Sequence, residues 1–142
     1  LKVIDDAIQI MDLTELKNKF INELSGGQSQ RAFLAMTIAQ NTNILLLDEP
    51  TTFLDINYQI KFLESLKNLI QIKKLSIITV LHDINLAARF CDRIAIIKEG
   101  KLIDINTPKK VLNKENFKIG FEIDSHIIDT PFGMQIFPVS KT

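Results

Sequence analysis

Residues 24–31 read Leu-Ser-Gly-Gly-Gln-Ser-Gln-Arg, and residues 44–50 read Ile-Leu-Leu-Leu-Asp-Glu-Pro. These two segments decide the fold of the 142-residue chain. In the first, a serine and two glycines favour a tight turn that opens a helix. The second is a short unbroken apolar strand, typical of parallel sheets and expected to be buried on both faces, that ends in two carboxylates. Together they indicate an α/β fold that places polar chemistry at a helix start and at a strand end.

Hydrophobic periodicity extends this pattern along the chain. Helices are expected at residues 2–11, 28–40, 55–70 and 84–90, and apolar strands at residues 44–47 and 76–81. The alternation of strand and helix is typical of a doubly wound α/β domain. The apolar residues of 28–40 point to more than one side, which predicts that this helix is mostly buried.

After Asp92 the pattern becomes β-rich. Strands are expected at residues 93–98, 101–105, 117–123 and 134–139, the first two joined by a hairpin turn at Glu99-Gly100. Thr107-Pro108 predicts the start of a short helix, and Asn106 is expected in the left-handed conformation. No interdomain linker is evident, so these residues are interpreted as a β-rich C-terminal tail.

Composition narrows the classes of protein. The chain has 17 basic and 17 acidic residues, so its charge gives no reason to expect binding to nucleic acid. The single cysteine, Cys91, excludes an internal disulfide and fits a reducing compartment. No apolar run approaches the roughly 20 residues of a membrane span. The chain starts at Leu1 in the middle of a pattern, which we interpret as a piece of a longer protein.

The turn at residues 24–28 is a candidate anion site. Gly26 and Gly27 leave backbone N–H groups open to a ligand, and Ser25 adds a hydroxyl donor. The helix that follows directs the positive end of its dipole to the same point. For Ser-Gly-Gly alone, a serine N-cap with a glycine turn is the better explanation, and only the whole run of residues 24–31 favours a phosphate.

Two carboxylates follow the first apolar strand. Strand ends in open α/β folds are where ligands bind. Asp48 can hold Mg²⁺ through its water shell, and Glu49 can orient and deprotonate an attacking water. The alternative is a polar loop that happens to contain an Asp-Glu pair. His82 follows the second apolar strand, although a single histidine is more often structural.

Four segments in this order resemble the motifs of ABC transporter ATPases. They are the signature motif at 24–31, the Walker B strand with its glutamate at 44–50, the D-loop at 51–55 and the switch histidine in 80–83. Residues 49–56, 80–87 and 90–92 look like those of the ATPases that drive iron-siderophore and cobalamin import. Asn106 departs from the glycine usual in that group.

The resemblance implies a fold and a set of roles. The fold would be a partial P-loop NTPase core of the RecA-like, ABC type, with residues 44–142 as its C-terminal part and residues 1–43 as the second half of the helical subdomain. Glu49 would be the general base, His82 a contact to the terminal phosphate, and Asp48 the residue for Mg²⁺. A last set would face the ATP of a partner subunit: Leu24, Ser25, Gly26, Gly27, Gln28 and the D-loop's Asp55.

The resemblance also implies partners and a place in the cell. Two such ATPase subunits pair head to tail as a homodimer, dock on a membrane permease at the cytoplasmic face and close on two ATP molecules. The function expected of the intact protein is ATP hydrolysis coupled to import, with ferric siderophores as the expected substrate. The alternatives are a non-transport ABC ATPase, such as a repair or translation factor, and a truncated module that only caps a partner's nucleotide.

The 142 residues contain no Gly-x-x-x-x-Gly-Lys-Ser/Thr phosphate loop. We therefore expect that this chain alone neither binds nor hydrolyses ATP. In the family's sheet, the strand that precedes this loop separates the strands matching 76–81 and 93–98. Without it both strands have an open edge, so a rearranged sheet or self-association of the chain is expected.

Overall fold

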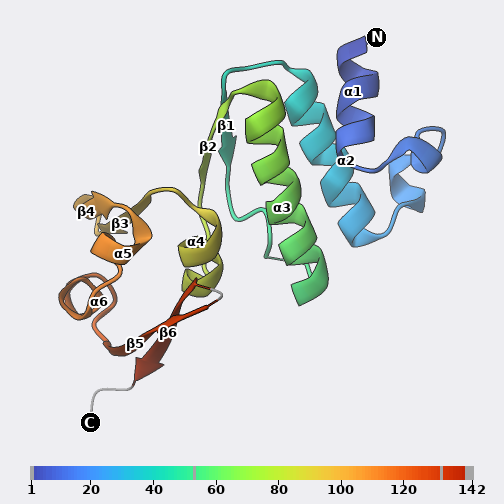
Figure 1. Ribbon diagram of the computed structural model, residues 1–142. Coiled ribbons are helices and arrows are strands. Elements are labelled where there is room, and N and C mark those ends of the chain that lie inside the picture. The colour runs from blue at the N-terminus through green and yellow to red at the C-terminus, as the bar shows by residue number, and fades with distance from the viewer. Residues whose placement is uncertain (1, 53, 132, 140–142) are drawn as a thin grey trace. The chain divides into compact units, whose positions relative to one another are not determined.

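A computed structural model describes residues 2–52, 54–131 and 133–139 of the chain (Figure 1). The backbone divides into two units, Leu1–His82 and Asp83–Thr142, and each is described by itself. The expected α/β class is confirmed, since both units combine helices with short strands.

The first unit holds the two segments that decided the fold. Its elements are α1 (Lys2–Ile10), the 3₁₀ turns η1 (Thr14–Leu16) and η2 (Ile21–Glu23), α2 (Gly26–Ala39), β1 (Ile44–Leu47), α3 (Ile56–Lys73) and β2 (Ser76–Thr79). Strands β1 and β2 pair in parallel, with Leu46 opposite Ile78. The register of this pair is regular, and the expected rearrangement or self-association at its open edge stays a prediction.

Helices α1 and α2 pack side by side (Figure 1). The guanidinium of Arg31 in α2 fastens this contact, because its Nη1 donates to the carbonyls of Met11 and Asp12 at 2.9 and 3.1 Å. Carbonyls at a helix C-terminus lack partners within the helix, and a cation suits that end of the dipole. The buried apolar side chains of this unit are Ala7, Met11, Leu13, Leu34, Ala35, Ile38, Leu45, Phe62, Leu63, Leu66, Leu69 and Leu75.

Two predictions about burial in this unit are wrong. Helix α2 is not mostly buried, since the side chains of Phe33 and Met36 are 56% and 61% exposed. Strand β1 is buried on one face only, with Leu45 covered and Leu46 70% exposed. Both predictions rested on the apolar content of the segments. Apolar content indicates how much surface a segment can bury, but it does not show whether another element covers that surface.

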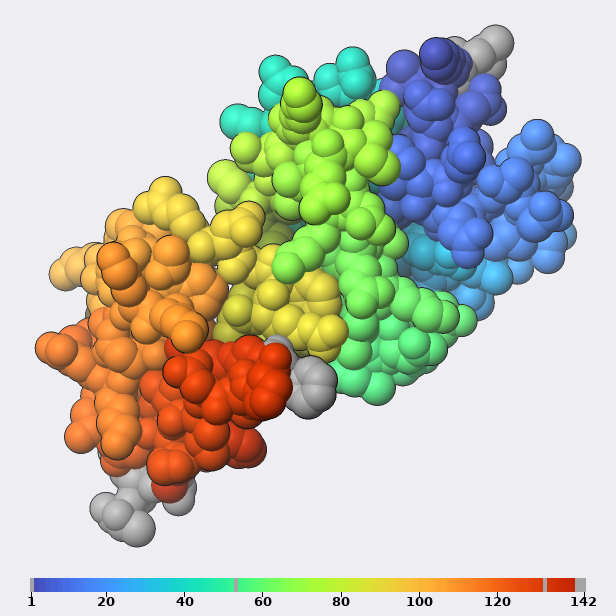
Figure 2. Space-filling view, in the orientation of Figure 1, coloured from blue at the N-terminus to red at the C-terminus, as the bar shows by residue number. Residues whose placement is uncertain are grey.

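The second unit contains α4 (Ile84–Phe90), β3 (Ile94–Lys98), β4 (Lys101–Asn106), α5 (Pro108–Val111), α6 (Lys114–Phe121), β5 (Asp124–Thr130) and β6 (Gly133–Val139). The strands form two antiparallel hairpins, β3–β4 and β5–β6. Its orange and red segments pack closely in the space-filling view (Figure 2). They surround a core of Ile96, Val111, Leu112, Phe117 and Ile136.

Two predictions fail in this unit. Residues 117–123 are not a strand: α6 reaches Phe121, and the strand β5 begins only at Asp124. The side chain of Asn113 caps α6 by accepting from the backbone N–H of Asn116 at 2.9 Å, a start signal that the sequence interpretation missed. Asn106 is not left-handed, since it is the last residue of β4. In the predicted hairpin turn before β4, by contrast, Glu99 and Gly100 are left-handed, with φ of 50° and 72°.

None of the helices in the described ranges combines the length and the apolarity that crossing a membrane would require.

Candidate functional site

The start of α2 is a capped and solvent-exposed corner. Ser25 is the N-cap, and its Oγ accepts from the backbone N–H of Gln28 at 3.3 Å. The Gln28 side chain returns the bond by accepting from the Ser25 N–H at 2.9 Å, which completes a capping box. The predicted turn is therefore shorter than expected, since the helix already begins at Gly26 and not at Gln28.

The two glycines at this corner differ in what surrounds them. A Cβ on Gly27 would lie 3.6 Å from a methyl group of Leu54, an ordinary packing distance, whereas a Cβ on Gly26 would meet no atom within 4 Å. Packing among the described residues therefore does not require a glycine at position 26. The first N–H groups of a helix have no partner within the helix, so this exposed corner can donate to an anion.

The end of β1 places a carboxylate against the end of β2. His82 Nε2 lies 2.7 Å from Glu49 Oε1, a hydrogen-bonding distance. The other oxygen, Oε2, accepts from the Thr52 hydroxyl at 3.2 Å. The Val80 N–H donates to the Leu47 carbonyl at 3.0 Å, which extends the pairing of the two strands towards this point. The two side chains stay accessible, with His82 71% and Glu49 42% exposed.

Two glutamine side chains hold the loop that follows Glu49. Nε2 of Gln30 in α2 donates to the carbonyl of Pro50, and Nε2 of Gln59 in α3 donates to the carbonyl of Thr51 at 3.0 Å. The sequence interpretation gave neither glutamine a role. Gln30 could have been suspected from its place in the 24–31 motif, whereas no sequence signal pointed to Gln59.

Asp55 is the N-cap of α3, because its Oδ1 accepts from the Tyr58 N–H at 3.0 Å. Its prediction as a helix cap is confirmed, and a contact to a partner subunit stays a prediction. The loop that ends at Asp55 runs close to α2, since Leu54 and Tyr58 border Gly27.

The end of β1 also suits a magnesium ion. Asp48 is exposed and forms none of the hydrogen bonds or ion pairs seen among the described residues, so its oxygens can accept ligand contacts. Mg²⁺ prefers carboxylate oxygens and commonly binds one or two of them together with water and substrate phosphates. A complete protein cage is absent from the described part of the chain, where no three His, Cys, Asp or Glu residues cluster. Asp48 therefore fits a metal that the substrate also holds.

The structure brings together some of the predicted site residues and not others. Glu49 and His82 meet, although they follow different strands and lie 33 positions apart in the sequence. Within the described residues no hydrogen bond joins the corner at residues 24–28 to Asp48, Glu49 or His82. The corner and the strand ends are thus two separate surfaces of the same unit.

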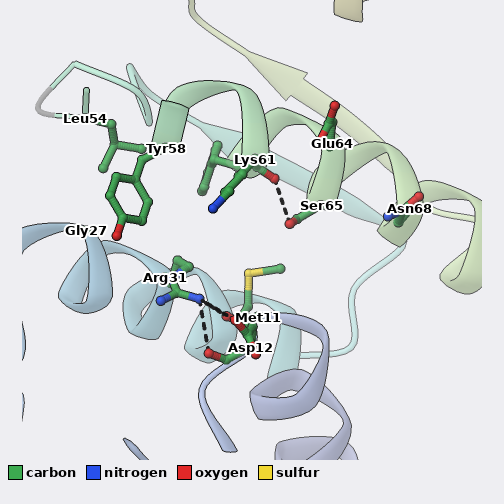
Figure 3. Close-up of a pocket in the computed structure, with 11 residues that line it drawn as sticks. Met11, Asp12, Gly27, Arg31, Leu54, Tyr58, Lys61, Glu64, Ser65 and Asn68 are labelled. Atoms are coloured by element: carbon green, nitrogen blue, oxygen red, sulfur yellow. Dashed lines mark hydrogen bonds and ion pairs between the residues drawn. The ribbon is translucent and has the colours of Figure 1, made fainter. Parts of the chain in front are cut away.

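A groove of about 370 Å³ lies between the end of α1, α2 and α3 (Figure 3). Arg31, Tyr58 and Lys61 line it, and Gly27 forms part of one wall. Neither Glu49 nor His82 contributes to the lining. This groove is therefore not the place where those two side chains meet.

Comparison with known proteins decides the family. The family described as ABC transporter matches residues 2–52. The chain is 46% identical over 125 residues to the petrobactin import ATP-binding protein FpuC of Bacillus anthracis, which covers 87% of this chain and 46% of that protein. It is 40% identical over 130 residues to the ferric enterobactin transport ATP-binding protein FepC of Escherichia coli, covering 92% and 48%. The chain belongs to the ABC transporter ATPase family.

Solved structures of ABC proteins agree with this assignment. The dimeric cassette MJ0796 matches with a TM-score of 0.65 and 34% identity over 75% of this chain and 46% of that one. An ABC transporter in an inward-facing conformation matches with a TM-score of 0.86 at 24% identity, over 97% and 57%, which supports the fold. This ABC chain spans about half the length of the curated relatives it matches.

Proposed function

We propose that this chain is the C-terminal part of an ATPase that couples ATP hydrolysis to import, with ferric siderophores as the substrate. The observation that carries the proposal is the 2.7 Å contact between Glu49 and His82 at the ends of two parallel strands. The printed names of the relatives support the substrate class, because petrobactin import and ferric enterobactin transport recur among them. The longer protein, and not the chain alone, would have this activity.

The strand ends supply the chemistry. Glu49 acts as the general base that orients and deprotonates the attacking water, and His82 contacts the terminal phosphate. Thr52 holds one oxygen of the Glu49 carboxylate and His82 holds the other. The carboxylate is therefore already oriented, and little reorganisation is needed when a water arrives. Asp48 would hold Mg²⁺, which when bound neutralises charge on the phosphates.

The exposed start of α2, at residues 24–28, contacts a different ATP molecule from the one on which Glu49 acts. The Ser25 hydroxyl and the N–H groups of Gly26 and Gly27, flanked by Leu24 and Gln28, cap the ATP held by a second ATPase subunit, and Asp55 lies at the same boundary. Residues 1–43 then belong to the helical subdomain and residues 44–142 to the ATPase core, and the dimer docks on permease subunits at the cytoplasmic face of the membrane.

The test of hydrolysis uses the longer protein with Mg²⁺ and a phosphate-release assay. His82→Ala should lower kcat by about 10²-fold, since acid–base and phosphate contacts contribute on that order. His126→Ala is the matched control, because His126 is exposed on β5 and has no predicted role. Equal rates for the wild type and His82→Ala would contradict the proposed site.

The test of transport uses cells in which the longer protein is the sole source of this ATPase. The Glu49→Gln variant should abolish uptake of a radiolabelled ferric siderophore. If the Glu49→Gln variant loses ATP hydrolysis but the cells still take up the siderophore at the wild-type rate, the result would instead favour a non-transport ABC ATPase.

A further inference from the structure

The amide of Gln30 joins the two surfaces of the first unit. Its Nε2 donates to the carbonyl oxygen of Pro50, the residue directly after Glu49. A carbonyl oxygen can only accept, so the side-chain NH₂ group and not its oxygen must face Pro50. The bond is partly buried and spans 20 positions of sequence.

The partners of this bond are rigid on both sides. Gln30 lies four residues after Gly26, which is about one turn or 6 Å along the same helix, so the exposed corner and Gln30 move as one body. On the other side, the ring of Pro50 fixes its backbone φ, and Glu49 has a left-handed φ of 46°. A displacement of the loop therefore changes where the Glu49 carboxylate points.

Gln59 provides an internal comparison. Its amide holds the next carbonyl of the same loop, that of Thr51, but it extends from α3. Both glutamines support the loop, and only Gln30 connects it to the helix that carries the exposed corner.

We propose that Gln30 is a positioning residue that couples the start of α2 to Glu49. The inference rests on the proposed function, in which the corner contacts one ATP and Glu49 acts on another. When the corner closes on a partner's nucleotide, α2 moves the Pro50 carbonyl through Gln30 and brings Glu49 into its hydrolytic position. Each ATP site then reports its occupancy to the other site.

The experiment measures ATP hydrolysis by the longer protein as a function of ATP concentration. Two coupled sites give a Hill coefficient between one and two. Gln30→Met keeps the side-chain length and removes the donor, and it should reduce the Hill coefficient to about one with kcat lowered about ten- to hundredfold. The KM for ATP should change by less than about twofold, since Gln30 does not face the nucleotide in this proposal.

Three further variants separate coupling from loop support. Gln59→Met should lower kcat but keep the cooperativity, because its bond comes from α3. Gln30→Lys restores a donor of similar reach and should retain the cooperativity, which keeps the test informative if Gln30→Met folds poorly. Gln40→Met, at the exposed end of α2, is the neutral control and should behave as the wild type.

The outcomes distinguish this inference from the proposed function. Cooperativity lost in Gln30→Met and kept in Gln59→Met supports the coupling. If the wild type hydrolyses ATP cooperatively and Gln30→Met does so equally, or if both methionine variants lose cooperativity alike, the coupling role is wrong and the ATPase function stands. If the wild-type longer protein does not hydrolyse ATP, both proposals fail.

Discussion

Glu49 occupies a left-handed backbone conformation that residues other than Gly, Asn and Asp rarely adopt. Its φ of 46° costs about 1 kcal/mol relative to the right-handed region. In return its carboxylate reaches His82 on one side and Thr52 on the other. Strained backbone of this kind is often found where a side chain has to point in one direction for function.

The residue-scale prediction follows from this geometry. Glu49→Gln in the longer protein should reduce ATP hydrolysis by at least about 10²-fold, because an amide cannot accept a proton from water. The affinity for ATP should stay within about twofold, as measured by calorimetry. Glu15→Gln, at an exposed position in η1, should leave both quantities unchanged. A Glu49→Gln variant with wild-type turnover would remove Glu49 from the mechanism.

At the scale of elements, the Asn85 side chain joins helix α4 to strand β6 by two hydrogen bonds. The amide of Asn85 donates to the Ile136 carbonyl at 3.2 Å and accepts from the Ile136 N–H at 2.7 Å. It thereby satisfies the backbone groups of Ile136 that do not face β5, as an additional strand would do. Because Ile136 is 2% exposed, these groups have little access to water as a substitute.

Asn85→Ala should therefore destabilise the second unit by about 1–3 kcal/mol, since it leaves a buried N–H and a buried C=O without partners. Hydrogen exchange detected by NMR should show faster exchange of the Ile136 amide, and denaturant unfolding should show the lower stability. Asn18→Ala, in an exposed turn of the first unit, is the control. Unchanged protection of the Ile136 amide would show that the paired bonds contribute little.

At the scale of the whole molecule, the chain leaves apolar strand surface uncovered. Leu46 of β1 lies opposite Ile78 of β2, and their side chains are 70% and 62% exposed. Apolar strands that pair in parallel are usually buried on both faces, so this exposure is unusual. Burial of apolar surface stabilises association by about 25 cal/mol per Å². Uncovered strands with open edges are sites of pairing between copies.

We expect the 142-residue chain by itself to self-associate as its concentration rises, which sedimentation velocity would detect. Leu46→Thr combined with Ile78→Thr should shift the distribution towards monomer, because the change removes apolar surface, and threonine, being β-branched, suits a strand. Leu102→Thr, on the exposed side of β4, should have a smaller effect. A monodisperse monomer at all concentrations would contradict this expectation.

The same chain should not bind ATP. The exposed corner and the strand ends are present, but the 142 residues include no Gly-x-x-x-x-Gly-Lys-Ser/Thr loop to hold the phosphates. Calorimetry with Mg²⁺ and ATP should show no saturable heat for the chain, whereas the longer protein should bind. Saturable binding to the chain alone would overturn the prediction.

The sequence by itself determined the family, the positions of most helices and strands, and the caps at Ser25 and Asp55, because these depend on residues near one another in the chain. It misplaced the strand at residues 117–123, where an asparagine cap outweighed an apolar run. Only the tertiary structure decided that Glu49 meets His82, that Gln30 and Gln59 hold the loop between them, and that Leu46 is uncovered. Such contacts join residues far apart in sequence, and their geometry depends on how strands and helices pack, which no local pattern records.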